Sequence, residues 1–270
     1  MATGEVCPDA NDAIGVREAW AAAWVIRFPN AREAKPSLKE QTMSYHFQDG
    51  GTELPEESLG DRATQVGSTK HFTGRLVIGD DAGRRLGVES HLETKAALLL
   101  STRSDTLSLV EQVRFEWFDA DGEIHDHYID LVVARADGVK IGYAVRPWAR
   151  VSARYLEELS RIKEQSIAAG ALDDFRVFTE SDVCPLELHN AKLFHSVRRP
   201  DVFADPVVRD VLQNMAGVFT VDAVVEATGL DGMAFRAVAR LIRSGHLALV
   251  CPERITRKTR IFKALEISHG

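Results

Sequence analysis

The sequence predicts an α/β protein in which a mixed sheet is flanked by helices, with a C-terminal winged-helix domain. Short apolar strands alternate with amphipathic helices between about residues 71 and 199. Turns that contain Asp and Gly separate consecutive strands in the middle of that stretch. After about residue 200, three short helices precede a hairpin whose loop is basic. These observations favour a sheet-based core followed by a smaller helical domain.

Length and turn signals divide the chain into three parts. A chain of 270 residues is long enough for more than one domain. Residues 1–70 contain one predicted amphipathic helix, from Asp12 to Arg27, which ends before Pro29 and precedes a polar, partly irregular arm. Residues 71–199 form the predicted core, and residues 200–270 form the predicted winged helix.

The elements of the core are predicted from periodicity and from boundary residues. The first helix, Val88 to Ser101, has apolar positions at helical spacing and places Glu89 and Glu93 on one face. The second helix, Val151 to Ala169, ends at Gly170. The predicted strands are Arg75–Ile78, Val113–Phe118, Ile129–Ala134, Lys140–Val145 and Phe175–Phe178. A mixed sheet with helices beside it satisfies this order.

The C-terminal elements have the order of a winged helix. Thr220 is a suitable N-cap for the second helix, and Gly245 ends the third. In helix-turn-helix proteins, the second helix of the pair enters the major groove of DNA. The predicted helices are Pro206–Met215, Val221–Thr228 and Met233–Ser244, and the hairpin strands are His246–Val250 and Arg260–Leu265.

The net charge of −7 is not that of a uniformly basic nucleic-acid binder, but the charge is uneven. The three helix arginines have the spacing of one exposed stripe that would read bases, and the loop cations would lie over phosphates. The same module can instead contact a protein, and an arginine stripe can be an ordinary solvated face. The basic loop favours DNA binding. These cations are Arg236, Arg240, Arg243, Arg254, Arg257, Lys258 and Arg260.

Several short segments of the core follow one another in a distinctive order. They are Glu89-Ser90-His91-Leu92-Glu93, Glu111-Gln112, His127-Tyr128-Ile129-Asp130-Leu131, Asp137-Gly138 and Ala144-Val145-Arg146-Pro147. In order and spacing they resemble the endonuclease subunit of heteromeric transposases, the TnsA family. Family members read Glu-Ser-x-Leu-Glu, Glu-Gln, His-x-x-Asp-Phe, Asp-Gly and Glu-Val-Lys-Pro. The resemblance covers about residues 73–199, with a looser similarity in the C-terminal winged helix, and implies a restriction-endonuclease-like core.

The resemblance also implies a remnant catalytic site at Glu93, Asp130 and Arg146. Nucleases of this kind hold one or two Mg²⁺ ions on carboxylates, and a lysine stabilises charge on the phosphate. Here Ala144 stands at the acid position and Arg146 at the lysine position. Alanine ligates nothing, and arginine stays protonated. Glu93 and Asp130 alone would bind a metal weakly or not at all, so a pseudonuclease without a cofactor is expected; Mg²⁺ is needed only if activity survives.

Two function classes therefore stay open. In the first, the protein is a DNA-binding pseudonuclease that regulates or assists a mobile element or the chromosome. In the second, it is an active Mg²⁺-dependent, DNA-cleaving subunit of a heteromeric transposase, in which Glu89 or Glu111 replaces the missing acid. Double-stranded DNA is the expected partner in both classes. The resemblance implies two further partners, a DDE-type transposase and an AAA-type ATPase, and a homodimer is left open.

The predicted role of Arg146 also has two forms. A guanidinium can donate two hydrogen bonds to one phosphate, so Arg146 would turn the former catalytic pocket into a phosphate-binding site. Alternatively, Arg146 would pair with Asp130 or Glu93, because two carboxylates without a metal favour a nearby cation. Taken singly, the acidic residues of the site can also be ordinary surface acids.

Other features exclude or weaken further classes of function. His125 and His127 could bind a metal with Asp130, although a strand-end role is favoured, and Trp148 is expected in the core or over the sheet edge. The sequence has no nucleotide-binding motif and no apolar run of 18 residues, and its acidic start is not a secretory signal. A reducing compartment is expected, because the cysteines are isolated; they are Cys7, Cys184 and Cys251. The expected location is the bacterial cytoplasm, with association to the nucleoid.

Overall fold

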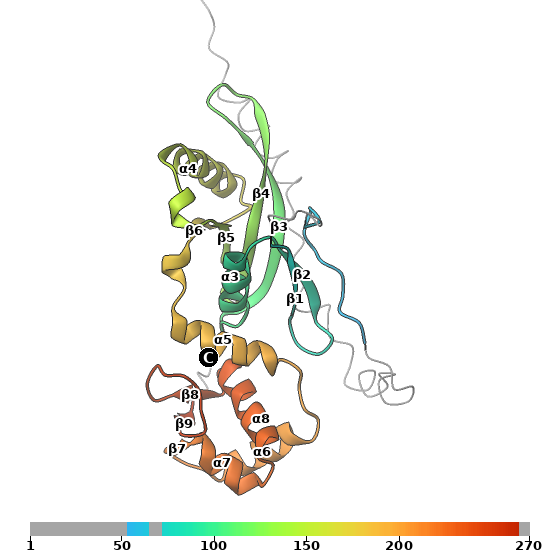
Figure 1. Cartoon of the computed structure of the whole chain (residues 1–270), viewed down its shortest axis with the longest axis vertical. Helices are drawn as coiled ribbons and strands as arrows, with labels where there is room; N and C mark the ends of the chain where they lie inside the picture. Colours follow the sequence, from blue (N-terminus) through green and yellow to red (C-terminus); the bar gives the residue numbers. More distant parts are fainter. Residues whose placement is uncertain (1–52, 65–71, 265–270) are drawn as a thin grey trace, which may run out of the picture.

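The structure, a computed structural model, describes residues 53–64 and 72–264 (Figure 1). The predicted helix from Asp12 to Arg27 and most of the arm after it lie outside the described residues. The described part contains a two-stranded, a four-stranded and a three-stranded sheet. None of its helices combines the length and the apolar character that crossing a membrane requires.

The central sheet has four strands in the order β3-β4-β5-β6. The strands β3 (Thr106–Phe118), β4 (Ile124–Arg135) and β5 (Lys140–Val145) are antiparallel neighbours. The strand β6 (Asp174–Phe178) pairs in parallel with β5. Parallel pairing requires a crossover connection, and the helix α4 (Ala153–Ala168) lies in it. The predicted mixed sheet flanked by helices is therefore confirmed.

Two apolar clusters enclose the sheet. In one cluster, Ala97 of α3 (His91–Ser101) packs with Leu131 of β4. In the other, Ile162 of α4 packs with Val132 of β4. Because neighbouring residues of β4 belong to different clusters, the sheet is covered by a helix on each face.

The side-chain alternation is interrupted where Gln112 of β3 and Asp130 of β4 face each other. Gln112 has a φ of 49°, in the left-handed region that residues other than glycine rarely adopt. On β4, Ile129 and Val132 belong to the same apolar cluster, although residues three apart on a regular strand face opposite sides. Gln112 Nε2 donates a hydrogen bond to Asp130 Oδ1 at 3.2 Å. The irregularity thus brings two polar side chains together within an otherwise apolar sheet.

The core contains two elements that were not predicted. The strand β1 (Gly74–Ile78) was expected, but β2 (Arg84–Val88) pairs with it as an antiparallel hairpin beside α3 (Figure 1). Leu86 of β2 is fully buried in the cluster that contains α3. The helix α5 (Pro185–Ser196) follows β6 and runs toward the C-terminal part (Figure 1).

The C-terminal part contains helices and strands in the predicted order. Thr220 caps α7 as predicted, by accepting a hydrogen bond from the N–H of Ala223 at 3.1 Å, and Gly229 ends it with a φ of 67°. The strand β9 lies between β7 and β8, so the predicted hairpin gains a third strand that was not predicted. Val208 and Val238 belong to a separate apolar core. The elements are α6 (Ala204–Gln213), β7 (Val218–Thr220), α7 (Val221–Thr228), α8 (Gly232–Arg243), β8 (Leu247–Leu249) and β9 (Arg260–Lys263).

Two predicted positions within core elements are wrong. Glu89 does not lie on the helix, because α3 begins after its N-cap Ser90, whose hydroxyl accepts a hydrogen bond from the N–H of Glu93 at 3.0 Å. The strand that contains Asp130 does not begin at Ile129, because β4 already begins at Ile124, so Asp130 lies in its middle. The β3–β4 hairpin is longer than its apolar stretch, so apolarity alone marked only part of each strand.

Two arginines join the C-terminal part to the β1–β2 turn of the core. Arg198, which follows α5, donates hydrogen bonds to the carbonyls of Gly79 and Asp81 at 3.1 and 2.8 Å. Arg243, at the end of α8, pairs with Asp80 of the same turn at 3.2 Å. These contacts hold α8 against the core.

Candidate functional site

A cleft of about 470 Å³ lies where Asp130 of β4, the end of β5 and the N-terminal ends of α3 and α4 come together. All three residues predicted for the remnant catalytic site line this cleft. Folding therefore assembles the site that the sequence motifs predicted, from segments far apart in the chain. The lining residues are Arg62, Thr73, Glu89, Ser90, Glu93, Asp130, Val145, Arg146, Pro147, Arg150 and Tyr155.

Glu93 is fixed at the start of α3 by hydrogen bonds to both carboxylate oxygens. Ser90 Oγ donates to Oε1 at 2.8 Å, and the backbone N–H of Glu89 donates to Oε2 at 2.8 Å. Together with the N-cap bond from Glu93 to Ser90, this arrangement is related to a capping box. Burial raises the pKa of Glu93, and the nearby charge of Glu89 adds to the rise, while the hydrogen bonds oppose it.

Asp130 is held in the same way on the neighbouring strands. The N–H of Val145 donates to Oδ2 at 2.7 Å, and Gln112 donates to Oδ1 at 3.2 Å. Burial, and then the negative charge of Glu93, raises the pKa of Asp130 to about 7. At neutral pH this carboxyl group is therefore protonated for about half of the time, which reduces the negative charge of the cleft.

Arg62 connects the acidic residues from a segment that the sequence analysis did not single out. Its guanidinium pairs with Glu89 at 2.9 Å and donates to Gln112 Oε1 at 2.6 Å. It also lies 5.2 Å from the centroid of the Tyr128 ring. A hydrogen-bonded chain thus runs from Arg62 through Gln112 to Asp130. No motif marks Arg62, which lies in a polar stretch before the first predicted strand.

Arg146 lies over an aromatic ring and does not pair with the carboxylates. Its guanidinium carbon is 4.2 Å from the centroid of the Tyr155 ring, and its Nε donates to the carbonyl of Arg150 at 3.2 Å. Within the described part of the chain, no ion pair joins Arg146 to Asp130 or Glu93. The predicted internal salt bridge is therefore not formed, and the guanidinium lines the cleft.

Neither of two further candidate positions supplies an acid to the cleft. Ala144 is fully buried in the apolar cluster that contains Leu159 of α4. Glu111 is also buried, and it pairs with Arg84 at 3.3 Å and accepts a hydrogen bond from the N–H of Gly87 at 3.0 Å. Glu111 is thus committed to a structural ion pair and does not line the cleft.

The residues of the cleft do not fit the metal centre of a working nuclease. Mg²⁺ demands near-octahedral oxygen coordination. Each carboxylate oxygen of Glu93 and Asp130 accepts one hydrogen bond, which uses part of its capacity to bind a metal, and the side chain at position 144 offers no oxygen ligand. Among the residues that the structure describes, the groups close enough to share a metal ion lie at the β3–β4 turn and the start of β4, outside the cleft; they are Asp119, Glu123 and His125.

The predicted metal site of His125, His127 and Asp130 is not assembled. His125 Nε2 lies 2.8 Å from Asp119 Oδ2, in the turn. The ring of His127 lies 6.3 Å, centroid to centroid, from that of Phe175, and burial lowers the pKa of His127 to about 4. Neither histidine lines the cleft with Asp130.

Trp148 is at the surface rather than in the core. Its exposed fraction is 62%. It begins the short 3₁₀ helix η1 (Trp148–Arg150), directly after the cleft residue Pro147. The backbone N–H of Trp148 donates a hydrogen bond to Glu180 Oε2 at 2.9 Å, which connects η1 to η2 (Glu180–Asp182). The indole is therefore accessible beside the cleft.

The predicted arginine stripe of α8 is exposed only at Arg236. Arg240 forms an ion pair with Asp205 of α6, and it donates a hydrogen bond to the carbonyl of Val197 at 3.3 Å. Arg243 is held by the β1–β2 turn. In this arrangement, Arg240 and Arg243 stabilise the protein's own junction rather than facing solvent.

The loop between β8 and β9, together with the first residue of β9, has more predicted cations without an ion pair than α8 has. Arg257 pairs with Asp222 at 2.5 Å and with Asp231 at 2.8 Å. The other three cations are exposed and form no ion pair within the described residues; they are Arg254, Lys258 and Arg260. The loop thus presents a positive surface even though Arg257 is engaged.

Comparison with known proteins gives no match to any protein-family model and no match to a curated protein.

Proposed function

We propose that this protein binds double-stranded DNA through a TnsA-like nuclease core that does not cut, with a winged-helix domain beside it. The protein would act as a regulator or accessory factor of a mobile element or of the chromosome, at the nucleoid in the cytoplasm. The observation that carries the proposal is Arg146, which lines the cleft beside Glu93 and Asp130 without pairing with either carboxylate.

The charges of the cleft favour a phosphate despite the acidic residues. Arg62 neutralises Glu89 through their ion pair. The pKa of Asp130 is raised to about 7, mainly by burial, so its negative charge is only partial at neutral pH. Arg146 and Arg150 lie at the cleft without an ion pair in the described part of the chain. Their positive charge is therefore available to an anion.

The geometry of Arg146 is suited to holding a phosphate. The Tyr155 ring and the Arg150 carbonyl fix the plane of the guanidinium. A fixed guanidinium loses little freedom when it donates two hydrogen bonds to one phosphate. Because no full set of metal ligands is present, such a contact would hold the backbone without activating water.

The β8–β9 loop supplies a second positive surface that is anchored to the core. The side chain of Asn190 in α5 accepts a hydrogen bond from the N–H of Ile255 at 3.0 Å and donates one to the carbonyl of Glu253 at 2.9 Å. The loop cations therefore keep a fixed position relative to the cleft. Contacts of this kind go to phosphates, so they would add affinity without sequence preference.

The decisive experiment measures binding and cleavage on the same labelled duplex DNA, with Mg²⁺ or Mn²⁺ present. We expect salt-dependent binding, no cleavage, and roughly tenfold weaker binding in Arg146→Ala with an unchanged melting temperature. Arg154→Ala is the matched control, because Arg154 is exposed on α4 and does not line the cleft. Metal-dependent nicking that disappears in Asp130→Ala would refute the loss of cleavage. Equal binding by Arg146→Ala and wild type would refute the phosphate contact.

The second candidate is an active Mg²⁺-dependent cleaving subunit that works with a DDE-type transposase and an AAA-type ATPase. One observation favours it: Glu89 lines the cleft with Glu93 and Asp130, so three acids share one cavity. Glu89 would have to leave Arg62 before it could act as the missing acid. Cleavage that appears only when the partners are added would support this candidate.

The C-terminal part could serve protein contact instead of DNA contact. The engagement of Arg240 and Arg243 within the junction removes two of the residues predicted to read bases. The free cations of the β8–β9 loop are what favours DNA. If substitution of Arg254 and Lys258 leaves the salt dependence of DNA binding unchanged, this part is a protein-contact domain.

A further inference from the structure

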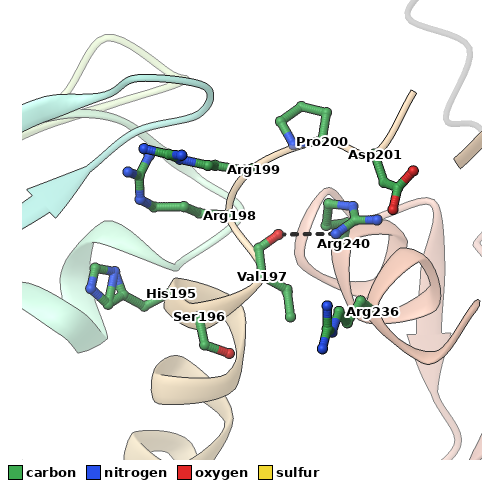
Figure 2. A pocket seen from close by; sticks show the side chains of 9 residues that line it. All are labelled: His195, Ser196, Val197, Arg198, Arg199, Pro200, Asp201, Arg236 and Arg240. Carbon is green, nitrogen blue, oxygen red and sulfur yellow. Dashed lines mark hydrogen bonds between the residues drawn. The ribbon is translucent and has the colours of Figure 1, made fainter. Parts of the chain in front are cut away.

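A second pocket, of about 300 Å³, lies at the junction between the core and the C-terminal part (Figure 2). The end of α5, the linker that follows it and one side of α8 form its walls. This pocket shares no lining residue with the carboxylate cleft. The lining residues are His195, Ser196, Val197, Arg198, Arg199, Pro200, Asp201, Arg236 and Arg240.

Four of these residues are arginines, and they fall into two kinds. Arg198 and Arg240 are engaged, the first with carbonyls of the β1–β2 turn and the second with Asp205 and a linker carbonyl. Arg199 and Arg236 are exposed, and neither donates a hydrogen bond to another residue of the described chain. Two fixed cations thus stand beside two cations that are free to bind.

Positive groups lie close together at this junction, and nearby acids offset only part of their charge. Burial lowers the pKa of Arg198, and the adjacent charge of Arg199 lowers it further, while Asp80 and Asp81 oppose the shift. Burial also lowers the pKa of His195, and the charges of Arg198 and Arg243 add to that effect. Burial is the larger cause of both shifts, and the neighbouring cations are a smaller one, so an anion bound here would face several close positive charges.

Asp201 is the one acid that lines the pocket, and its carboxylate already accepts hydrogen bonds from the backbone. Asp201 Oδ1 accepts hydrogen bonds from the N–H groups of Phe203 and Ala204 at 3.0 and 2.9 Å, where α6 begins. A carboxylate in this position mainly compensates the helix N-terminus. Asp201 therefore offsets only part of the positive charge of the pocket.

The arginines are spread along the pocket instead of converging on one point. In Figure 2, Arg198 and Arg199 lie on one side of the linker, and Arg236 and Arg240 lie on the other. A single compact anion would engage only one of these sides. A chain of phosphates can engage both, because its charges recur along its length.

We infer that this junction is a second contact for the nucleic-acid backbone, in which Arg199 and Arg236 bind successive phosphates and Arg198, held by backbone carbonyls, supplies a fixed positive charge. The inference rests on the proposed DNA binding and adds a site that is separate from the Arg146 cleft. It also gives Arg236 a role in backbone binding instead of base reading.

The test compares the salt dependence of duplex DNA binding between the full-length wild type and the double variant Arg199→Ala, Arg236→Ala. Each lost phosphate contact lowers the magnitude of the negative slope of log K against log salt by about 0.9, so we expect this magnitude to fall by about 2 and binding to weaken equally on unrelated sequences. Arg209→Ala is the control, because Arg209 is an exposed arginine of α6 outside the pocket. Melting temperatures of the variants should match that of the wild type.

The possible failures are distinguishable. If the wild type shows no salt-dependent DNA binding, the proposed function itself is wrong, and the inference is wrong with it. If the wild type binds and Arg146→Ala weakens binding, but the double variant keeps the wild-type slope, only the junction site is wrong. Weakening of the double variant on one sequence alone would also overturn it, because that result assigns Arg236 to base reading.

Discussion

The protonation of Asp130 in the carboxylate cleft contributes to the free energy of unfolding of the protein. Its unfolded pKa is about 3.9 and its folded pKa is about 7, raised first by burial and then by Glu93. Between these values, the folded protein keeps a proton that the unfolded chain releases. The free energy of unfolding therefore falls as pH rises through this window, and the loss is complete above pH 7.

Replacing this residue should remove that pH dependence. In Asp130→Asn, we expect the free energy of unfolding at pH 8 to rise relative to wild type, by an upper bound of about 4 kcal/mol, with little relative change at pH 4. Urea unfolding across this range measures the difference. Asp121→Asn, an exposed change in the β3–β4 turn, is the control.

The wild-type curve alone is insufficient, because the lowered pKa of buried His127 contributes the opposite slope below pH 6.5. A constant difference between Asp130→Asn and wild type at all pH values would contradict the assignment.

At the residue scale, the sequence predicted the site where chemistry restricts the residue type. Glu93, Asp130 and Arg146 were predicted from motifs, and the structure brings all three to one cleft. Arg62 and Tyr155 were not predicted as partners in the site. An arginine in a polar stretch and a tyrosine at core spacing carry no local signal of a contact with distant residues.

At the scale of single elements, α8 differs from a helix whose arginines are all free to contact DNA. Arg240 pairs with Asp205 and donates to the carbonyl of Val197. We therefore expect Arg240→Ala to destabilise the protein by about 3 kcal/mol, because it leaves Asp205 half-buried without its cation. Chemical denaturation measures this loss. Arg209→Ala, on the exposed side of α6, should cost less than about 0.5 kcal/mol. Unchanged stability of Arg240→Ala, with a lost preference for one DNA sequence, would restore the base-reading prediction.

The elements themselves could be predicted where local signals agree. The strand β5 and the helix α7 have the predicted bounds, because apolar periodicity and turn or cap residues coincide there. The strand β2 was missed because it has only two apolar residues, Leu86 and Val88, with a glycine, Gly87, between them, which is too short a pattern to mark a strand. The helix α5 was missed because its polar and apolar residues have weak periodicity, although Pro185 stands at its first position.

At the scale of the whole molecule, the orientation of α8 depends on the contacts with the β1–β2 turn. Arg198 donates to the carbonyls of Gly79 and Asp81. In Arg198→Ala we expect faster amide exchange in this turn and at the end of α8, with the central sheet unchanged, because the junction alone is loosened. Hydrogen exchange measured by mass spectrometry tests this. Arg199→Ala is the control, because Arg199 makes no hydrogen bond within the described chain. Equal protection of the turn in Arg198→Ala and wild type would show that the junction does not depend on this residue.

The two hydrogen bonds between the Asn190 side chain and the β8–β9 loop determine where the C-terminal part can be separated from the rest of the chain. A gene fragment that begins at residue 200 lacks α5, so the buried N–H of Ile255 and the carbonyl of Glu253 lose their partner. Each unmet group of this kind costs about 1–3 kcal/mol if it stays away from water. A fragment that begins at Pro185 contains α5 and therefore keeps both hydrogen bonds of Asn190. Any recombination that transplanted this C-terminal part onto another protein would therefore have to carry α5 with it.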